Sequence, residues 1–231
     1  MTDRTLAQVR TQFWIDLVRG LHSGKVPKHP VAEQLSTAVT NRQPSRKLLE
    51  QLASSRSQFS IDLPFDSLEQ VEEYGESAFS SIYLLLLELM GNTSGHAKHA
   101  ATRLGKCEGY VTLIRGSPYN ASKRRVYIPG QLLSEQGLTA EQLLRSGGEG
   151  EGVRRVVELL AARAQQHLDS CRFRAKYLSR EQKLVLLPAV AADHYLAKLA
   201  KAECNPWDQE VMKRNSWLAA SLSYHKYKQT Y

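Results

Sequence analysis

Helical periodicity runs through almost the whole of this 231-residue chain and restricts its fold more than any other feature. Apolar and small residues recur at spacings of three and four, which predicts buried helical faces. The clearest such face comprises Val153, Val157, Leu160, Ala164, His167, Cys171 and Ala175. A second predicted buried face comprises Leu6, Val9, Phe13, Leu17 and Leu21. No apolar–polar alternation of useful length and no internal repeat is found, so the sequence predicts an all-α protein.

Breaks and caps divide this pattern into separate helices. Segment 22–30, "HSGKVPKHP", predicts a break. Further helices are predicted over 31–40, 44–54 and 67–91. Asp66 with Glu69 has the spacing of a capping box at the start of the third of these. Asn205 followed by Pro206 predicts another helix start, with the asparagine as N-cap.

The chain is long enough to bury one core, and we predict a single domain over residues 1–231. Segment 145–152, "RSGGEGEG", is the most flexible stretch predicted and the one candidate linker. The most apolar run is "IYLLLLELM" over 82–90, and it contains Glu88. A membrane span needs about 20 apolar residues, so this run predicts a core helix.

Charge and cysteine content restrict the class of protein only loosely. The net charge of +8 and the pI near 9.4 favour acidic partners such as phosphates, anionic lipids or acidic protein faces. Cys107, Cys171 and Cys204 are odd in number and widely separated. They form neither a disulfide framework nor a zinc motif, which favours a reducing compartment and buried structural thiols.

Groups of chemically active side chains are few. His96 and His99 have a spacing that presents two imidazoles to one metal, but a third ligand is lacking, so we expect packing or surface histidines. A solvated acidic face is expected rather than a magnesium site for Glu69, Glu72, Glu73 and Glu76. No phosphate-binding glycine loop and no nucleophile–histidine arrangement is found. We therefore predict no catalytic residue, no cofactor site and no metal site.

The most distinctive charged feature is the cluster Lys123, Arg124 and Arg125, with Arg115 ten residues before its end. Two interpretations of it stay open. The cluster is either a site for a phosphate or an acidic protein, or a solvated turn, and charge alone favours the turn.

The run around this cluster resembles a motif of the squalene/phytoene synthase family, which are all-helical prenyl-diphosphate synthases. "TLIRGSPYNASKRRVYIP" is similar to the family pattern "NxLRDxxEDxxxGRxYLP". Arg115 takes the place of the arginine in the motif, and Arg125, Tyr127 and Pro129 match its end. The resemblance implies an all-α helical bundle of the isoprenoid synthase type.

The resemblance also implies a loss of catalysis. Family members hold Mg²⁺ with Asp-rich motifs and use it to ionise an allylic diphosphate, whereas Gly116, Tyr119 and Asn120 stand where the motif has its acids. These residues supply none of the carboxylates that Mg²⁺ requires. The other Asp-rich motif of the family is not found in this sequence. The only close aspartate pair, Asp62 and Asp66, lies on either side of Pro64. We expect the equivalent of that motif to lie before the first residue of this sequence. The chain is therefore expected to be a pseudoenzyme.

Within the family, several stretches resemble a non-catalytic mitochondrial branch that assists assembly of respiratory complex I. They are "LAQVRTQFW", "HPVAEQL", "HAKHAATRLGKCEGYVTLIRGSPY", "SKRRVYIP" and "LSYHKYKQTY". This implies contact with complex I subunits or assembly intermediates early in assembly, and peripheral attachment to the matrix side of the mitochondrial inner membrane. No nucleic-acid partner is expected. The transit peptide and first helices of that branch are missing here, which leaves a cytoplasmic form as an alternative.

Two other functions stay open. One is a module that binds a prenyl or lipid phosphate without chemistry, through Arg115, Lys123, Arg124, Arg125 and Tyr127. The other is a residual Mg²⁺-dependent isoprenoid transferase, for which the glutamates from Glu69 to Glu76 are the candidate ligands.

Overall fold

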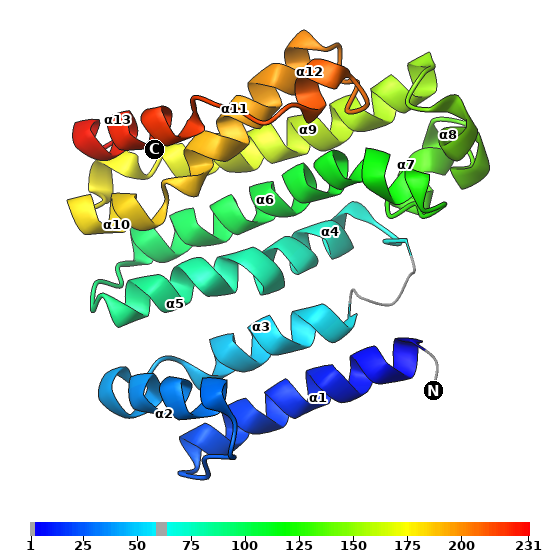
Figure 1. Cartoon of the computed structure of the whole chain (residues 1–231). Coiled ribbons are helices and arrows are strands. Elements are labelled where there is room, and N and C mark those ends of the chain that lie inside the picture. The colour runs from blue at the N-terminus through cyan, green and yellow to red at the C-terminus, as the bar shows by residue number, and fades with distance from the viewer. Residues whose placement is uncertain (1–2, 59–63) are drawn as a thin grey trace.

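The computed structural model describes residues 3–58 and 64–231, and every regular element in these ranges is helical (Figure 1). The predicted all-α fold is confirmed. The first half contains α1 (Asp3–His22), α2 (Pro30–Arg42), α3 (Arg46–Gln58), α4 (Leu68–Gly75), the π-helical turn η1 (Glu76–Ser80), α5 (Ser81–Leu89) and α6 (Gly95–Ser122). The second half contains α7 (Gly130–Glu135), α8 (Ala140–Ser146), α9 (Glu151–Arg172), the 3₁₀ turn η2 (Ala175–Tyr177), α10 (Arg180–Val185), α11 (Pro188–Lys201), α12 (Gln209–Met212) and α13 (Leu218–Lys228).

The long helices lie side by side in successive layers (Figure 1). At the centre, α6 and α9 run antiparallel and form the most extensive contact between any two elements. The continuous rod of α4, η1 and α5 covers one side of α6, while α11 and then α13 follow on the other side. Beyond the rod lie α3 and, at the edge of the molecule, α1 and α2.

The hydrophobic core is centred on α6 and α9. Leu104 and Ile114 of α6 and Leu160 and Leu168 of α9 are fully buried. Every residue from Val153 to Cys171 that the periodicity assigned to the α9 face is buried, which confirms that prediction. The remaining member, Ala175, lies half-buried in η2.

The face predicted for α1 is buried only in part. Leu17 and Leu21 are buried in a small separate cluster with residues of α2, but Leu6, Val9 and Phe13 are exposed. The prediction was wrong for these three residues, because α1 lies at the edge of the molecule and its outer side faces solvent. Periodicity identifies an amphipathic helix but does not say what covers its apolar side.

Small residues bring α6 very close to the rod of α4 and η1. A Cβ atom at Gly105 would lie 2.8 Å from the Cα of Ser80, and one at Gly109 would lie 2.9 Å from the Cα of Gly75. The backbones of the two elements are therefore in direct contact on this face of α6. The predicted helix over 67–91 is a single rod, but it contains the π-helical turn at the point of contact.

The predicted capping box at Asp66 is wrong. The N-cap of α4 is Ser67, and Asp66 instead pairs with Gln70. The Asp66 N–H donates to Gln70 Oε1, and Gln70 Nε2 donates to Asp66 Oδ2, both at 2.8 Å. The amide of Gln70 can donate and accept at the same time, so it satisfies both groups where the Glu69 carboxylate can only accept.

The predicted helix start at Asn205 is also wrong. Its side chain accepts a hydrogen bond from the Trp207 N–H at 2.9 Å, which closes a local turn. The following helix, α12, begins at Gln209, and Asp208 caps it by accepting from the Glu210 and Val211 N–H groups. Asparagine favours turns and N-caps by the same hydrogen bond, and here the turn is formed.

The segment 145–152 forms the turn between α8 and α9. Gly147 and Gly148 have φ values of 59° and 90°, which favour glycine. Gly148 is buried so closely against the indole of Trp207 that a Cβ atom would overlap that ring. The flexibility predicted for this segment stays a prediction, but its centre is packed on the body of the protein.

The most apolar run forms α5 and the residue after it. Tyr83, Leu85 and Leu87 are buried, whereas Ile82 and Leu86 on the other side of the helix are exposed. Among the described helices, none has both the length and the apolarity of a membrane span.

Candidate functional site

The C-terminal half of α6 carries the motif residues and distributes them over different sides of the helix. Gly116 and Asn120 are one turn apart on the same side, where a Cβ atom at Gly116 would lie 3.2 Å from Asn120 Nδ2. Tyr119 is 67% exposed, and the Lys123 ammonium lies 6.0 Å from the centre of its ring. Two of the three positions where the family motif has acids are therefore neighbours, and neither residue can ionise.

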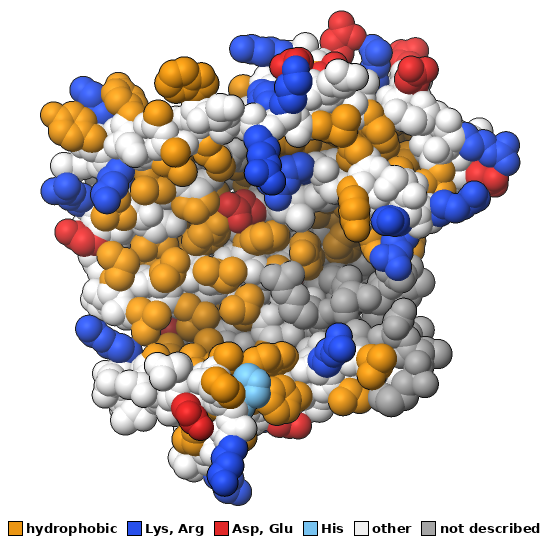
Figure 2. Space-filling model, viewed as in Figure 1, with side chains coloured by type: hydrophobic (Ala, Val, Ile, Leu, Met, Phe, Trp, Pro, Cys, Tyr) orange, Lys and Arg blue, Asp and Glu red, His pale blue; other side chains and the backbone are white. Residues whose placement is uncertain are grey.

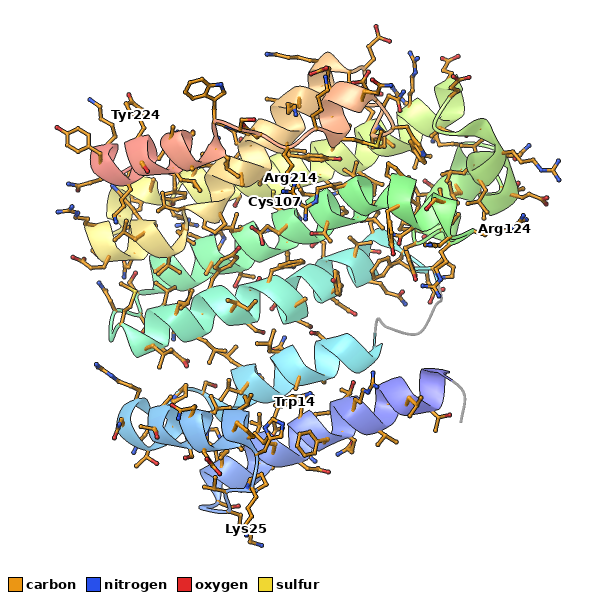
Figure 3. The ribbon with its side chains drawn as sticks, viewed as in Figure 1. Trp14, Lys25, Cys107, Arg124, Arg214 and Tyr224 are labelled. Atoms are coloured by element: carbon orange, nitrogen blue, oxygen red, sulfur yellow. The ribbon has the colours of Figure 1, made fainter. Side chains whose placement is uncertain are left out.

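Arg115 lines a pocket of ≈ 590 Å³ between α6, α11 and the segment that joins α12 to α13. Four cationic side chains line it, so we call it the cationic pocket: Arg115, Lys198, Lys213 and Arg214. Figure 3 shows Arg214 in the upper half of the view, just above the labelled Cys107 of α6. The walls are largely apolar, with Pro118, Tyr119, Ala191, Tyr195, Pro206, Val211, Met212 and Leu218. No lining residue has a carboxylate.

Two of the four cations are held by the protein, and two are not. Lys198 Nζ donates to the carbonyl oxygen of Lys213 at 3.0 Å, and the Lys213 ammonium pairs with Glu210. Within the described residues, neither Arg115 nor Arg214 has a carboxylate within ion-pair distance. Glu108 lies two turns before Arg115 on α6; burial raises the pKa of its carboxyl group, while the hydrogen bond from Tyr83 and the charge of Arg115 oppose that effect. Unpaired guanidinium groups in an apolar surround favour an anionic ligand.

Polar side chains of α11 stabilise the wall of the pocket. Asn215 Nδ2 lies 2.8 Å from His194 Nδ1, and Ser221 Oγ lies 3.3 Å from His194 Nε2, so this imidazole joins α11 to α13. The hydroxyl of Tyr195 is buried and has no hydrogen-bond partner among the described residues. Burial raises its pKa, so the hydroxyl stays protonated and can donate to a ligand.

The cluster Lys123–Arg125 forms the C-terminal cap of α6. Arg124 adopts a left-handed conformation with φ 57°. Its N–H donates to the Ala121 carbonyl at 2.8 Å, and the Arg125 N–H donates to the Asn120 carbonyl at 2.9 Å. This is the Schellman arrangement that ends many helices, and cations at a helix C-terminus also interact favourably with its dipole. The basic cluster thus has a structural role.

The structure does not bring all the predicted site residues together. Arg115 lies in the cationic pocket, whereas Lys123 and Arg124 are exposed beyond the end of α6, and Figure 3 shows Arg124 far from Arg214. Arg125 and Tyr127 line a separate cavity of ≈ 10 Å³, which is too small for a phosphate group.

Sequence reasoning missed three cations of the pocket, Lys198, Lys213 and Arg214. They come from segments about 80 to 100 residues beyond Arg115, and the spacing of a motif says nothing about such distant partners. One signal was present. Residues 211–231 contain four Lys or Arg side chains and no Asp or Glu.

The sequence predicts one solvated acidic face on α4 and the turn after it, and this prediction is wrong. Glu69 and Glu73 are exposed, but Glu72 is partly buried at the contact of α4, α6 and α9. Its carboxylate accepts hydrogen bonds from Lys106, His167 and Tyr110, with distances of 3.2, 3.2 and 3.3 Å. The Lys106 ammonium also lies 3.5 Å from Glu76. Buried acids persist where partners of this kind compensate for lost hydration.

The hydrogen bonds of this network determine which protons are bound. Burial lowers the pKa of His167, although Glu72 opposes this effect. Arg103 donates to His167 Nδ1 at 3.3 Å, so the neutral imidazole carries its proton on Nε2 and donates it to Glu72. Burial also opposes ionisation of Glu72, but the hydrogen bonds from Lys106 and His167 outweigh it and lower the pKa of this carboxyl group.

The remaining candidate ligands occupy packing positions. His96 stacks on Tyr177 with ring centres 4.4 Å apart, while His99 Nδ1 is buried without a partner among the described residues. Cys107 and Cys171 are buried, as predicted, whereas Cys204 is only partly buried, and burial raises the pKa of the Cys171 thiol to about 12. Across residues 3–58 and 64–231, no three His, Cys, Asp or Glu side chains are grouped as a metal site requires.

Comparisons with known proteins identify the family of the chain. The family model described as squalene/phytoene synthase matches residues 1–219. The chain is 29% identical over 231 residues to "NADH dehydrogenase (ubiquinone) complex I, assembly factor 6" of Bos taurus, covering 100% of this chain and 69% of that protein. It is 31% identical over 222 residues to the homolog of that factor in Drosophila melanogaster, covering 94% of this chain and 66% of that protein.

The fold has close counterparts among solved structures. A dehydrosqualene synthase in complex with a ligand superposes with a TM-score of 0.80 at 18% identity, covering 98% of this chain and 80% of the other. Likeness at that identity speaks to the fold alone, and it agrees with the all-helical architecture described above. The family model, by contrast, matches nearly the whole sequence, and so the chain belongs to the squalene/phytoene synthase family.

Proposed function

We propose that this protein is a non-enzymatic assembly factor for mitochondrial respiratory complex I, and that it acts by protein–protein contact early in assembly. The observation that carries the proposal is the similarity, over all 231 residues of this sequence and 69% of the relatives, to proteins named as assembly factors of complex I. The proposed partners are complex I subunits or assembly intermediates. The proposed location is the matrix side of the inner membrane, with peripheral attachment.

The residues at the former metal positions support a role without prenyl transfer. Gly116 and Asn120 are neighbours on α6, where carboxylates would have to hold Mg²⁺, and neither supplies one. The alternative of a residual transferase that uses the glutamates of α4 gains no support, because Lys106 already binds Glu72 and Glu76.

Native-gel analysis of respiratory complexes in cells depleted of this protein tests the assembly role. We expect complex I to be lost selectively and to return when the wild-type chain is expressed. Expression of Glu69→Gln/Glu73→Gln, which removes exposed carboxylates that a residual transferase would use, is the matched control for retained catalysis, and it should restore complex I equally well. Normal complex I in depleted cells would refute the proposal.

A second function, compatible with the first, is favoured by the cationic pocket. We propose that this pocket binds the phosphate of a prenyl or lipid phosphate without Mg²⁺. Arg115 and Arg214 supply unpaired guanidinium groups, Tyr195 supplies an unpartnered hydroxyl, and the apolar walls suit a hydrocarbon chain. This replaces the predicted grouping of Arg115 with Lys123, Arg124 and Arg125.

Titration of the purified protein with farnesyl phosphate, with and without a chelator, tests this second function. Binding should survive the chelator and fall at least about tenfold in Arg115→Ala/Arg214→Ala, since a charge-assisted hydrogen bond contributes about 1.5–3 kcal/mol. The matched control Lys123→Ala/Arg124→Ala removes the same net charge outside the pocket and should bind normally. Equal loss in both variants would mean that net charge, rather than the pocket, holds the ligand.

A further inference from the structure

The outer face of α13 carries aromatic side chains that point into solvent. Trp217, Ala220, Tyr224 and Tyr227 follow one another at spacings of three and four, so they form one stripe along the helix. The three aromatic residues are 78%, 58% and 80% exposed. The opposite face bears Leu222, which packs on the core, and Leu218, which lines the cationic pocket. An exposed aromatic stripe of this kind marks an interaction surface.

The charge around this stripe has one sign. Lys228 borders the stripe one turn after Tyr224, and Lys226 lies one turn after Leu222 on the inner side of the helix, with both side chains exposed. Residues 217–231 contain two Lys and no Asp or Glu side chain. Figure 2 shows basic side chains interspersed with apolar ones along α13, at the upper left edge. The complementary partner is therefore anionic.

Contacts at both ends hold α13 in place. At its start, Asn215 and Ser221 bond to His194 of α11. Beyond its end, the Tyr231 hydroxyl donates to the Cys171 carbonyl at 3.2 Å, and Arg172 Nε donates to the Tyr231 carbonyl at 3.1 Å. The stripe is thus presented on a fixed helix, and its binding does not require the helix to fold first.

A second group of aromatic and basic side chains follows the C-terminal end of α9, where the last residue, Tyr231, packs on that helix. Phe173 and Tyr177 are exposed, and the Lys176 ammonium lies 5.6 Å and 5.0 Å from the centres of their rings. Because Tyr231 contacts Cys171 and Arg172, this group adjoins the end of α13. The same combination of side chains is therefore found on both segments.

From these observations we infer that the outer face of α13 is the surface by which the protein lies on an anionic phospholipid bilayer. Trp and Tyr place an apolar ring at the level of the lipid headgroups and keep a polar atom in water, while lysines extend toward lipid phosphates. Lysine is depleted at protein–protein interfaces, so its place beside this stripe favours a bilayer over an acidic protein. The inference rests on the proposed peripheral attachment and adds the surface that makes it.

Co-sedimentation of the purified chain with phospholipid vesicles tests the inference. We expect binding to vesicles that contain about a third anionic lipid, much weaker binding to neutral phosphatidylcholine vesicles, and loss of binding at high salt. Lys226→Gln/Lys228→Gln should lower the partition coefficient at least about fivefold, since a lysine near an anionic surface contributes about that much and Lys228 lies beside the stripe. Tyr224→Ser/Tyr227→Ser should lower it at least about tenfold through lost apolar burial. Trp217, kept in both variants, should shift to shorter emission wavelength when the vesicles bind.

Matched variants separate this surface from general effects. Lys47→Gln/Lys98→Gln removes the same charge from exposed positions on α3 and α6, and Val9→Ser removes an exposed apolar side chain on α1, away from the cationic pocket. Both should bind vesicles like the wild type. All variants should have the same circular dichroism and melting temperature, because the substituted side chains are exposed.

The outcomes distinguish a bilayer from a protein partner. Native inner-membrane vesicles are compared with vesicles made from lipid extracted from them. Binding to the native membranes alone, lost in the α13 variants, would mean a protein partner and overturn the inference. Equal binding by wild type and α13 variants would also overturn it. Normal complex I in depleted cells, with vesicle binding intact, would refute only the proposed assembly role.

Discussion

His167 links α9 to α4 and α6 through two hydrogen bonds that fit only the neutral imidazole. Arg103 donates to Nδ1 at 3.3 Å, so protonation of that nitrogen would turn an acceptor into a second donor facing a guanidinium group. Burial lowers the pKa of His167 in the folded protein. A histidine in the unfolded chain has a pKa of about 6.5. Between these two values the unfolded state binds more protons than the folded state.

The sign of the pH dependence follows from this difference. The contribution of His167 to stability is complete above the unfolded pKa and is lost as the pH falls through the folded pKa. We expect the free energy of unfolding, measured with urea, to fall between pH 7 and pH 5. His167→Gln should lose about 1–3 kcal/mol at pH 7 from its broken hydrogen bonds and should show a smaller pH slope.

The variant isolates this one group. Burial also lowers the pKa of His99, but that histidine is present in both proteins and cancels in the comparison. The carboxyl of Glu72 titrates below this pH range, since its pKa is lowered. A pH slope that is the same in His167→Gln and the wild type would contradict the assignment of a neutral histidine.

At the scale of an element, the close contact between α6 and the rod of α4 and η1 predicts an asymmetric response to alanine. Gly105→Ala should destabilise the protein by about 1–3 kcal/mol, because the new methyl group would meet the backbone of Ser80. Gly95→Ala is the matched control at the start of the same helix, where nothing lies within 4 Å of the added atom. It should be neutral or stabilise by up to about 1 kcal/mol. Thermal and urea unfolding measure both effects, and equal stability of the two variants would contradict the contact.

The helices themselves were largely predictable from the sequence, but their surroundings were not. The spacing of apolar residues predicted both α9 and α1, yet the α9 face is buried whereas three of the five residues of the α1 face are exposed. Periodicity reflects what one helix alone prefers, whereas burial depends on which neighbours the chain provides. The caps at Asp66 and Asn205 failed for a related reason. Each side chain had two local hydrogen-bonding options of similar strength, and the spacing fits both.

The candidate site was predictable only along α6. The motif placed Arg115 on the same helix as Gly116, Tyr119 and Asn120, because all four lie within a short stretch of one element. The structure does not group it with Lys123 to Arg125, since the rest of α6, from Gly116 to Ser122, and its cap separate them. The cationic side chains that line the pocket with Arg115 come from α11 and the segment after α12, and only the folded chain brings them together.

At the scale of the whole molecule, the core is divided into two clusters of very different size. The large cluster joins α6 and α9 to most other helices, whereas the small one contains Leu17 and Leu21 of α1 with Ala32 and Val39 of α2. The free energy of local opening depends on how much buried apolar contact a region must lose. The α1–α2 edge should therefore open more easily than the α6–α9 centre.

Hydrogen exchange measured by mass spectrometry tests this division, because it reports opening segment by segment. We expect amides of α1 and α2 to exchange well before those of α6 and α9. Leu17→Ala, which removes a buried side chain of the small cluster, should lose protection in α1 and α2 while the centre keeps its own. Leu160→Ala, in the large cluster, should cost about 2–5 kcal/mol and lower protection throughout the chain, because the centre opens only with the whole molecule. If Leu17→Ala lowered protection in α6 and α9 as much as Leu160→Ala does, the two clusters would unfold as one unit. The helix α1 would then open together with the centre, despite its exposed face.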